Sequence, residues 1–160
     1  SAAYMESHFR NFLVTCVAGL GIGECDYSHN NLIYAPKFTG SLSAEHTLPT
    51  SFGKVVTSVG WRHISPYDEQ LSQNVIPTST SVVNDINGND SRVRTTMQDL
   101  VDASMSFNFN LNNTEAYVRV FGRNLLNEKT TTHAFTVAGL WSFGMALEPR
   151  TYGATIGIKF

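Results

Sequence analysis

The sequence predicts an all-β chain whose antiparallel strands form part of a transmembrane β-barrel. Three observations lead to this fold class: apolar and polar side chains alternate along several segments, each segment runs to about ten residues, and short connections alternate with long ones. In a strand, successive side chains point to opposite faces, so alternation gives one apolar and one polar face. The same period of two leaves no coherent apolar face on a helix, which argues against a helical fold.

Six segments carry the alternation. The clearest runs from Val101 to Leu111, where apolar residues at odd positions alternate with Asp, Ser and Asn at even positions. Thr151 to Phe160 and Phe38 to Leu48 show the same pattern. Weaker alternation extends over Ala3 to Phe12, Lys54 to Ile64 and Glu115 to Arg123. Each segment is long enough for a tilted strand to cross a bilayer.

The connections between these segments fall into two kinds. Pro49 to Gly53 and Asn112 to Thr114 are short and polar, as expected of hairpin turns. The connections at 13–35, 65–97 and 127–149 are much longer. Compact soluble domains seldom carry several such loops, whereas outer-membrane barrels combine short periplasmic turns with long external loops.

A soluble β-sandwich would show the same alternation, because it buries its apolar face and leaves its polar face in water. Aromatic residues near the predicted strand ends favour the barrel, since they are typical of an interfacial girdle. These aromatic residues are Phe38, Trp61, Tyr67, Phe109 and Tyr152.

Composition excludes several classes of protein. The 160 residues suit one architectural unit, and 11 Lys and Arg stand against 13 Asp and Glu without a basic run, so no nucleic-acid partner is expected. The longest apolar stretches are far shorter than the roughly 20 residues of a transmembrane helix. The first residues do not read as a signal peptide, so we expect a mature or truncated chain.

The end of the chain reads Pro149-Arg150-Thr151-Tyr152-Gly153 and then alternates to Phe160. This segment resembles the closing strand of TonB-dependent outer-membrane receptors, which commonly reads P-R-T-Y-G and then alternates to a terminal aromatic residue. The segment from Val120 to Lys129 resembles the family's penultimate strand with its N-L-x-[DN] motif. Tyr34 to Phe38 and Tyr4 to Phe9 resemble two further strand motifs, in the family's order. The residues that match the last two strands are Asn124, Leu125, Pro149, Arg150, Tyr152 and Gly153.

The resemblance implies a 22-stranded barrel plugged by an N-terminal domain in the outer membrane of a Gram-negative cell. Such receptors import ferric siderophores, cobalamin or carbohydrates with energy passed on by TonB. The plug, the TonB box and most strands are not among residues 1–160, so we expect a C-terminal segment that needs the remaining strands, the plug and TonB to transport. The resemblance also implies a recognition signal for the barrel-assembly machinery, carried by Tyr152, Ile156, Ile158 and Phe160.

Few residues suggest a site of their own. Cys16 and Cys25 are candidates for a disulfide across a loop, with two reduced thiols as the alternative. In the external loops, Tyr67, Trp141 and Phe143 are candidates for ligand contacts. Charged residues expected to face the lumen are Glu6, His8, Arg10, Arg62, Asp102, Arg119 and Arg123.

Other motifs are weak. Gly19, Gly21 and Gly23 form a G-x-G-x-G run without the strand and helix that a phosphate cradle requires, so a flexible loop is expected. The segment 85–90, D-I-N-G-N-D, lacks the twelfth-position Glu of a calcium loop. The five histidines are scattered without ligand spacing, and no nucleophile motif occurs. We therefore predict no metal, cofactor or enzymatic activity.

Two alternatives remain open. One is a complete eight-stranded outer-membrane barrel with a structural or adhesive role, which requires another hairpin within 65–97. The other is a soluble β-sandwich that binds a partner.

Overall fold

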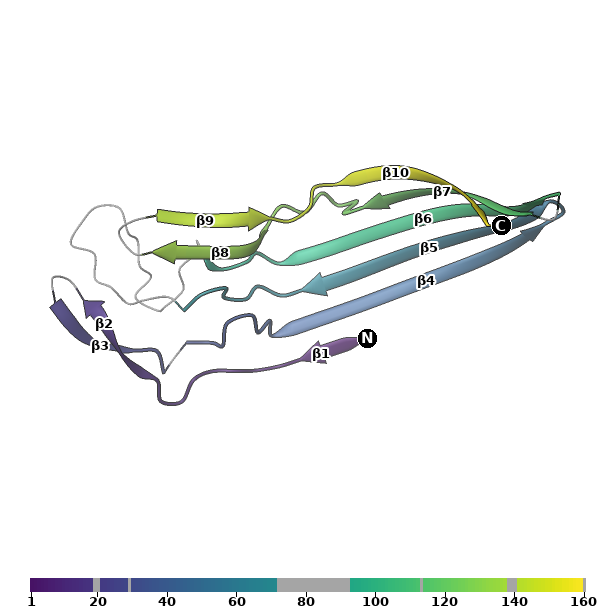
Figure 1. Ribbon diagram of the computed structural model, residues 1–160. Helices are drawn as coiled ribbons and strands as arrows, with labels where there is room; N and C mark the ends of the chain where they lie inside the picture. Colours follow the sequence, from purple (N-terminus) through teal and green to yellow (C-terminus); the bar gives the residue numbers. More distant parts are fainter. Residues whose placement is uncertain (19–20, 29, 72–92, 113, 138–140, 160) are drawn as a thin grey trace.

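The computed structural model describes residues 1–18, 21–28, 30–71, 93–112, 114–137 and 141–159. It is all-β and antiparallel, as the alternation predicted. Six strands form one sheet in the order β1-β4-β5-β6-β7-β10, and two separate hairpins, β2-β3 and β8-β9, extend from it (Figure 1). The two hairpins lie within the connections β1 to β4 and β7 to β10, so the six strands of the sheet follow one another in chain order, as in a meander.

The sheet consists of β1 (Ala2–Tyr4), β4 (Phe38–Thr50), β5 (Gly53–Ile64), β6 (Gln98–Leu111), β7 (Thr114–Arg123) and β10 (Thr151–Lys159). The hairpins consist of β2 (Leu13–Ala18), β3 (Gly21–Asp26), β8 (Thr131–Val137) and β9 (Trp141–Ala146). Five of the six predicted strands are confirmed to within a few residues. Among the described residues, no helix is long and apolar enough to cross a membrane.

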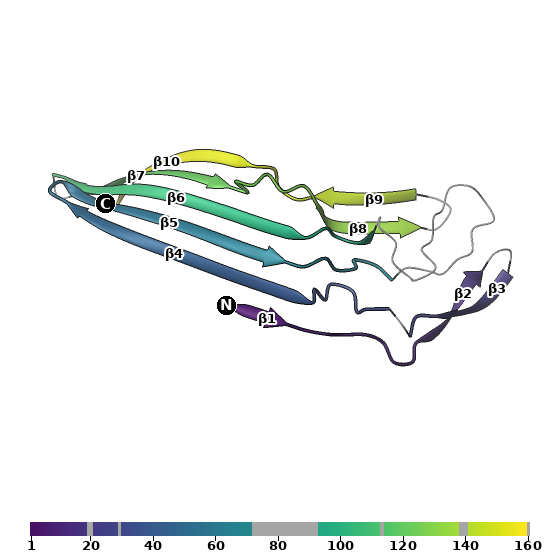
Figure 2. The same ribbon diagram turned by 180° about the vertical axis from the view of Figure 1, so that it is seen from behind.

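Both tight turns lie at one end of the sheet and the long connections at the other (Figures 1 and 2). The β4-β5 ladder closes on the pair Thr50 and Gly53. A Cβ atom on Gly53 would collide with the carbonyl oxygen of Asn108, so this turn requires glycine. At the second turn Asn112 has a φ of 49°, which asparagine tolerates better than other residues with a side chain. The expected turns at Pro49 to Gly53 and Asn112 to Thr114 are therefore confirmed.

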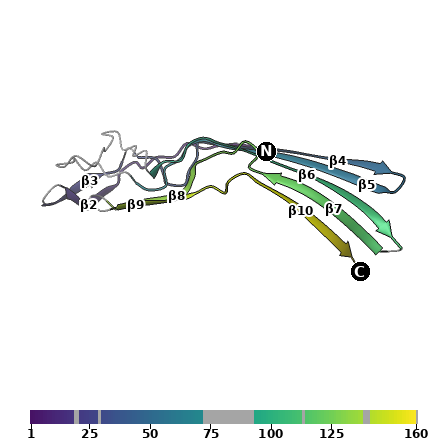
Figure 3. The ribbon, with the colours of Figure 1, turned by 90° about the horizontal axis from the view of Figure 1, so that it is seen from above.

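The ladder register separates the side chains of the sheet into an apolar and a polar face. Residues opposite each other on paired strands share a face, so the rows of partners define both faces. The apolar face carries Leu42, Leu48, Val55, Val59, Trp61, Val101, Met105, Phe107, Phe109, Val118, Val120, Tyr152, Ile156 and Ile158. The polar face carries Ser41, Ser43, Glu45, Lys54, Ser58, Arg62, Asp102, Ser104, Ser106, Asn108, Glu115, Arg119 and Arg123. The sheet is curved, as the view from above shows (Figure 3).

Buried side chains gather at the end with the long connections and not beneath the sheet. The buried apolar residues of the described chain are Tyr27, Val93, Leu100 and Ala134. The buried polar ones are Asp68, Glu69, Thr95, Gln98, Asn124 and Thr130. Large apolar side chains of the sheet stay exposed, with Leu42 at 69% and Ile156 at 77%. A layer that covers either face of the sheet is not found among the described residues.

Three expectations need correction. The predicted strand from Ala3 to Phe12 ends at Tyr4, because its partner β4 begins only at Phe38. Beyond Tyr4, Met5 donates to the Lys37 carbonyl and Phe9 to the Asn30 carbonyl, but these separate bonds do not extend the ladder. Glu6, His8 and Arg10 therefore do not lie on a strand that faces a lumen. The connections 13–35 and 127–149 hold the two hairpins, so Gly21 and Gly23 belong to β3 and not to a flexible loop.

Candidate functional site

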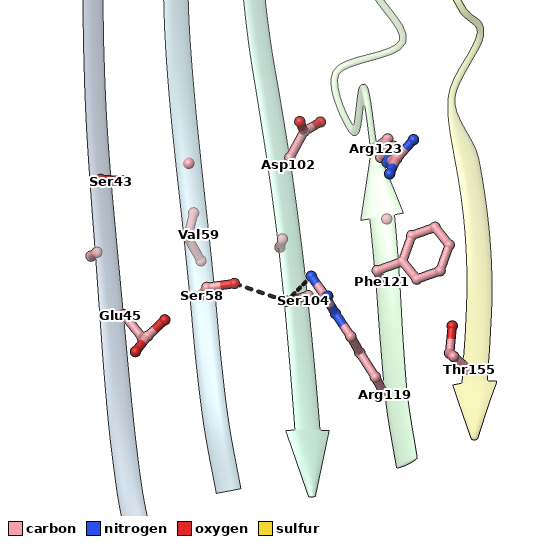
Figure 4. Close-up of a pocket in the computed structure, with 14 residues that line it drawn as sticks. Ser43, Glu45, Ser58, Val59, Asp102, Ser104, Arg119, Phe121, Arg123 and Thr155 are labelled. Carbon is pink, nitrogen blue, oxygen red and sulfur yellow. Dashed lines mark hydrogen bonds between the residues drawn. The ribbon is translucent and has the colours of Figure 1, made fainter. Parts of the chain in front are cut away.

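The polar face of the sheet contains a hollow of about 660 Å³. Its side chains come from five neighbouring strands, β4, β5, β6, β7 and β10 (Figure 4). At its centre the hydroxyls of Ser58 and Ser104 are hydrogen-bonded at 2.8 Å, and Arg119 donates from Nη2 to the Ser104 hydroxyl at 3.1 Å. These bonds run across the strands and hold Arg119 along the sheet. The hollow therefore offers a fixed guanidinium and hydroxyls on an open surface.

Charges of both signs border this hollow. Glu45 lies on the β4 side, and the Arg123 guanidinium lies 5.6 Å from the centre of the Phe121 ring on the β7 side. Asp102 accepts a hydrogen bond from the Asn124 backbone N–H at 2.8 Å, so its carboxylate holds the chain in place just after β7.

A second region, the loop junction, joins the three long connections. We define the loop junction by Tyr34, Tyr67, Glu69, Thr131 and His133. The Tyr34 hydroxyl and the His133 Nδ1 are hydrogen-bonded at 2.6 Å although they are 99 residues apart in the chain. Their rings are stacked with centroids 5.9 Å apart, and the Tyr67 ring lies 6.0 Å from that of Tyr34. The junction thus brings together side chains that no local pattern connects.

Backbone hydrogen bonds connect the segments that carry the loop junction. Tyr34 donates its N–H to the Asp68 carbonyl at 2.8 Å, and Glu69 donates to the Val93 carbonyl at 2.7 Å. The Asp68 carboxylate is paired with Arg94 at 3.2 Å. Because Asp68 is neutralised in this way, Glu69 is the carboxylate that gives the junction its negative potential.

Glu69 is 4% exposed, and neither of its carboxylate oxygens has a hydrogen-bond partner in the described structure. Burial raises the pKa of Glu69, while the Thr131 hydroxyl and the His133 ring act against this rise and only partly offset it. Burial also raises the pKa of Tyr34 and of Tyr67, and the negative charge of Glu69 adds to both rises. A buried carboxylate without a donor is costly, so this group favours a proton or a positive partner.

Aromatic side chains continue from the loop junction along one face of the β8-β9 hairpin. The ring centroids of Phe135, Trp141 and Phe143 lie between 5.7 and 6.1 Å from one another. Phe143 lies 6.4 Å from His133, which stacks on Tyr34. We call this series the aromatic track; it consists of Trp141, Phe135, Phe143, His133, Tyr34 and Tyr67. Its outer rings are partly exposed, with Trp141 at 53%.

Asn124 ties the two ends of the connection 127–149 together. Its side-chain amide donates to the carbonyls of Glu128 at 3.0 Å and Glu148 at 2.9 Å, and its Oδ1 accepts from the Glu128 N–H at 2.8 Å. Asn124 has a φ of 48°. Arg150 donates to the Leu125 carbonyl at 3.4 Å. The segment with the N-L-x-[DN] motif and the segment with the P-R-T-Y-G motif therefore contact each other just before β10.

The predicted site residues are distributed over several regions. Tyr67, Trp141 and Phe143 all join the aromatic track. Tyr152, Ile156 and Ile158 lie on the apolar face, with Pro149 just before β10 and Gly153 within it; Phe160 lies outside the described residues. The ladder sets Cys16 opposite Gly23 and Cys25 opposite Val14. The side chains of both cysteines lie outside the described part, so their pairing stays a prediction.

Sequence reasoning missed Glu69, Tyr34 and His133 as members of one site. A carboxylate, a phenol and an imidazole from three different connections give no local signal. The segment 85–90 lies outside the described residues, and no group of three His, Cys, Asp or Glu that could hold a metal ion occurs within them. No protein-family model, curated protein or solved structure matches the chain.

Proposed function

We propose that this chain forms the C-terminal strands of a TonB-dependent receptor in the outer membrane of a Gram-negative cell. Its function is the uptake of a scarce nutrient of the ferric siderophore, cobalamin or carbohydrate class, carried out together with the remaining barrel strands, the plug and TonB. The observation that carries the proposal is the two-faced sheet, whose apolar face lies open beside a polar face with a hollow.

The open apolar face supports a lipid environment. Soluble monomers rarely expose apolar patches of more than a few hundred Å², because contact with water is unfavourable. Here five adjacent strands present large apolar side chains on one face, including Leu42, Val120 and Ile156. Acyl chains would cover such a face without any further protein layer.

The height of the apolar face fits a membrane. On β6 it extends from Val101 to Leu111, ten steps that span about 34 Å along the strand at about 3.4 Å per residue. A tilt of about 40° reduces this length to a height of about 26 Å, close to the roughly 25 Å apolar band of outer-membrane barrels. Just beyond Val101, Asp99 is hydrogen-bonded to His63 at 2.9 Å and to the Trp61 indole at 3.0 Å. A polar cluster with a tryptophan suits the interface with the headgroups.

The edges of the sheet support an incomplete barrel. Among the described residues, β10 pairs with β7 alone, and β1 covers three residues of β4. Unpaired strand edges are not tolerated in hydrocarbon, so the proposal requires further strands at both edges. The family resemblance supplies their source and adds the barrel-assembly machinery as a partner of β10.

An eight-stranded barrel formed by this chain alone has less support. In an up-and-down barrel a hairpin from 65–97 would lie between β5 and β6. The register instead pairs β5 directly with β6 from Gly53 and Phe109 to Ile64 and Gln98. No gap is left between these two strands for another hairpin.

The proposal is tested by the environment of adjacent residues on β10. In a background with Cys16 and Cys25 changed to Ser, single variants Ile156→Cys and Thr155→Cys receive an environment-sensitive fluorophore. The chain is folded into vesicles of outer-membrane lipids together with the remaining barrel strands that the proposal requires. Because the two positions face opposite sides of the sheet, only the label at 156 should shift to the blue and be quenched by lipid-borne quenchers.

The matched label at Thr155 is the control for general burial, since both positions have the same depth. A chain that is monodisperse in water without detergent, with equal spectra for both labels, would establish the soluble sandwich instead. Lipid quenching at both positions would also contradict the two-faced arrangement.

A further inference from the structure

The apolar face of the sheet contains a groove of about 590 Å³. Its lining comes mainly from β6, β7 and β10, which lie side by side at one edge of the sheet (Figure 1). The volume falls within the roughly 300–1,000 Å³ of pockets that hold small ligands. Almost all of the lining is apolar, so the groove differs in character from the hollow on the polar face.

Two small residues form the floor of this groove. Ala103 on β6 and Gly122 on β7 are direct partners in the ladder, and the same row continues to Tyr152 on β10. The Leu125 side chain lies against Gly122, since a Cβ atom there would collide with Leu125 Cδ2 and would meet the Tyr152 ring at 3.1 Å. The small pair therefore leaves space on the apolar face, and Leu125 and Tyr152 border that space.

A guanidinium lies at the rim of the groove. Arg150 donates from Nη1 to the Leu125 carbonyl at 3.4 Å, and its guanidinium lies 6.0 Å from the centre of the Tyr152 ring. Arg150 is exposed, and among the described residues it forms neither an ion pair nor another hydrogen bond. Because a guanidinium carries five N–H donors, most of them are available to an anion.

The guanidinium and the groove follow one another in the order of the parts of a membrane lipid. Leu125 donates its N–H to the Val101 carbonyl, so Arg150 lies at the end of the apolar face, where Asp99 and Trp61 mark the proposed interface with the headgroups. From there the groove continues over Ala103 toward the middle of β6. An acyl chain in the groove would run toward the bilayer centre from a headgroup beside Arg150.

We infer that the groove, together with Arg150, binds a membrane lipid with a phosphate headgroup. One acyl chain lies over Ala103 and Gly122, and the phosphate accepts hydrogen bonds from the Arg150 guanidinium. A guanidinium and a phosphate match in charge and in the geometry of paired hydrogen bonds. The inference rests on the proposed function, because only a sheet whose apolar face meets a bilayer offers the groove to lipid. It adds one specific lipid as a partner.

Charge and position distinguish this lipid from other occupants. A strand that continues the barrel would pair along the outer edge of β10, whereas the floor of the groove lies on β6 and β7. A lipid without a phosphate would leave the guanidinium without an anion. A free phosphate would leave the apolar lining uncovered.

The test counts bound lipid by native mass spectrometry. The full chain is folded in micelles of an uncharged maltoside detergent, together with the remaining barrel strands that the proposed function requires. The probes are dioleoyl phosphatidic acid, dioleoylglycerol, which has the same acyl chains without the phosphate, and glycerol phosphate, which has no acyl chain. Phosphatidic acid should bind at least about tenfold more tightly than dioleoylglycerol, and glycerol phosphate should not be retained.

Variants separate the headgroup site from the groove. Arg150→Gln should weaken phosphatidic acid about tenfold without affecting dioleoylglycerol. Arg62→Gln is its control, since Arg62 is also exposed but lies on the polar face. Ala103→Phe fills the floor of the groove and should weaken both lipids about tenfold. Ala44→Phe is the matched control, because Ala44 belongs to the same row of the same face, two strands away from Ala103.

Equal binding of phosphatidic acid and dioleoylglycerol would overturn the inference, as would phosphatidic acid binding that survives either Arg150→Gln or Ala103→Phe. Glycerol phosphate bound as tightly as phosphatidic acid would show that a free phosphate is the ligand, and would also overturn it. Because Arg150 is exposed, Arg150→Gln decides the matter even if Ala103→Phe does not fold.

The labelling test on β10 has a separate outcome. If the label at position 156 meets lipid but phosphatidic acid is not preferred, the lipid site alone is refuted. If phosphatidic acid binds as described but the two labels have equal spectra, the receptor proposal alone is refuted.

Discussion

The ring of Tyr117 on β7 lies over Gly157 on β10, its direct partner in the ladder. A Cβ atom at Gly157 would collide with that ring, and a Cβ atom at Gly153 would collide with the ring of Phe121 in the same way. Two aromatic residues of β7 are thus each paired with a glycine of β10. Such pairs cover glycine with an aromatic ring and fix the register of a sheet.

Gly157→Ala should therefore destabilise the folded chain by about 1–3 kcal/mol, because the Tyr117 ring must leave its position. The measurement is the free energy of unfolding in urea with the chain in detergent micelles. Gly60→Ala on β5 is the control, since no atom lies within 4 Å of the added methyl group. It should be neutral or slightly stabilising, because alanine loses less backbone entropy than glycine. An equal cost at both positions would show that the ring does not set the register.

Asn124→Ala should destabilise the chain by about 2–4 kcal/mol, since three hydrogen bonds of the side chain are lost and a residue with a Cβ remains at positive φ. The melting temperature in micelles measures the loss. Asn124→Gly separates the two causes, because glycine relieves the backbone strain and still lacks the amide. If Asn124→Gly were as stable as the unchanged chain, the amide would not hold the two ends of the connection 127–149 together.

The stability of the loop junction should depend on pH through Glu69. Its pKa is raised in the folded chain, so its contribution is fully present below the unfolded pKa and is lost as the pH rises through the folded pKa. Glu69→Gln removes this charge and should be more stable than the unchanged chain at neutral pH. The difference should shrink as the solution is acidified.

The measurement is the protease resistance of the long connections in the unchanged chain and in Glu69→Gln. It is made from pH 4 to pH 8, the range where a carboxyl group of raised pKa titrates. Glu45→Gln is again the control, because Glu45 lines the open hollow and is not buried. A difference between Glu69→Gln and the unchanged chain that stays constant with pH would contradict the role of the Glu69 charge.

A charge on the apolar face should be far more costly than the same charge on the polar face. Ile156→Lys places an ammonium near the middle of β10 on the face proposed to meet lipid, where the cost in outer-membrane barrels is about 2–4 kcal/mol. Thr155→Lys adds the same group at the same depth on the polar face and should fold normally. The fraction of chain that folds into vesicles, measured by circular dichroism, distinguishes them. Equal folding of the two variants would contradict a lipid-facing side.

The sheet was predictable because its strands carry their own signal. Phe107 and Phe109 alternate with Asn108 and Asn110, and this pattern alone assigns both the strand and the face of each residue. The hairpins were missed because their segments lack such contrast: Gly21 to Asp26 mixes glycine with charge, and Thr131 to Val137 mixes hydroxyls with aromatic rings. The first strand was predicted to be too long, because its length depends on where its partner β4 begins.

The loop junction was not predictable in the same way. Tyr67, Trp141 and Phe143 could be chosen from the sequence as aromatic residues in long connections. Glu69, the buried carboxylate of the loop junction, could not be chosen in this way. Glu69 differs from the other carboxylates only in the folded chain, where it is buried and interacts electrostatically with Tyr34 and His133 from distant parts of the sequence. Burial without a partner is a property of the assembled connections, and no residue pattern encodes it locally.

The gathering of buried side chains at one end of the protein bears on its calorimetry. Heat capacity rises on unfolding chiefly when apolar surface becomes exposed to water. If lipid or detergent remains on the apolar face of the sheet, the described residues that newly meet water are mainly those around Val93, Leu100 and Ala134. We expect a heat capacity change well below the roughly 12–15 cal/mol/K per residue of water-soluble domains, and a thermogram that reports on the connections more than on the strands.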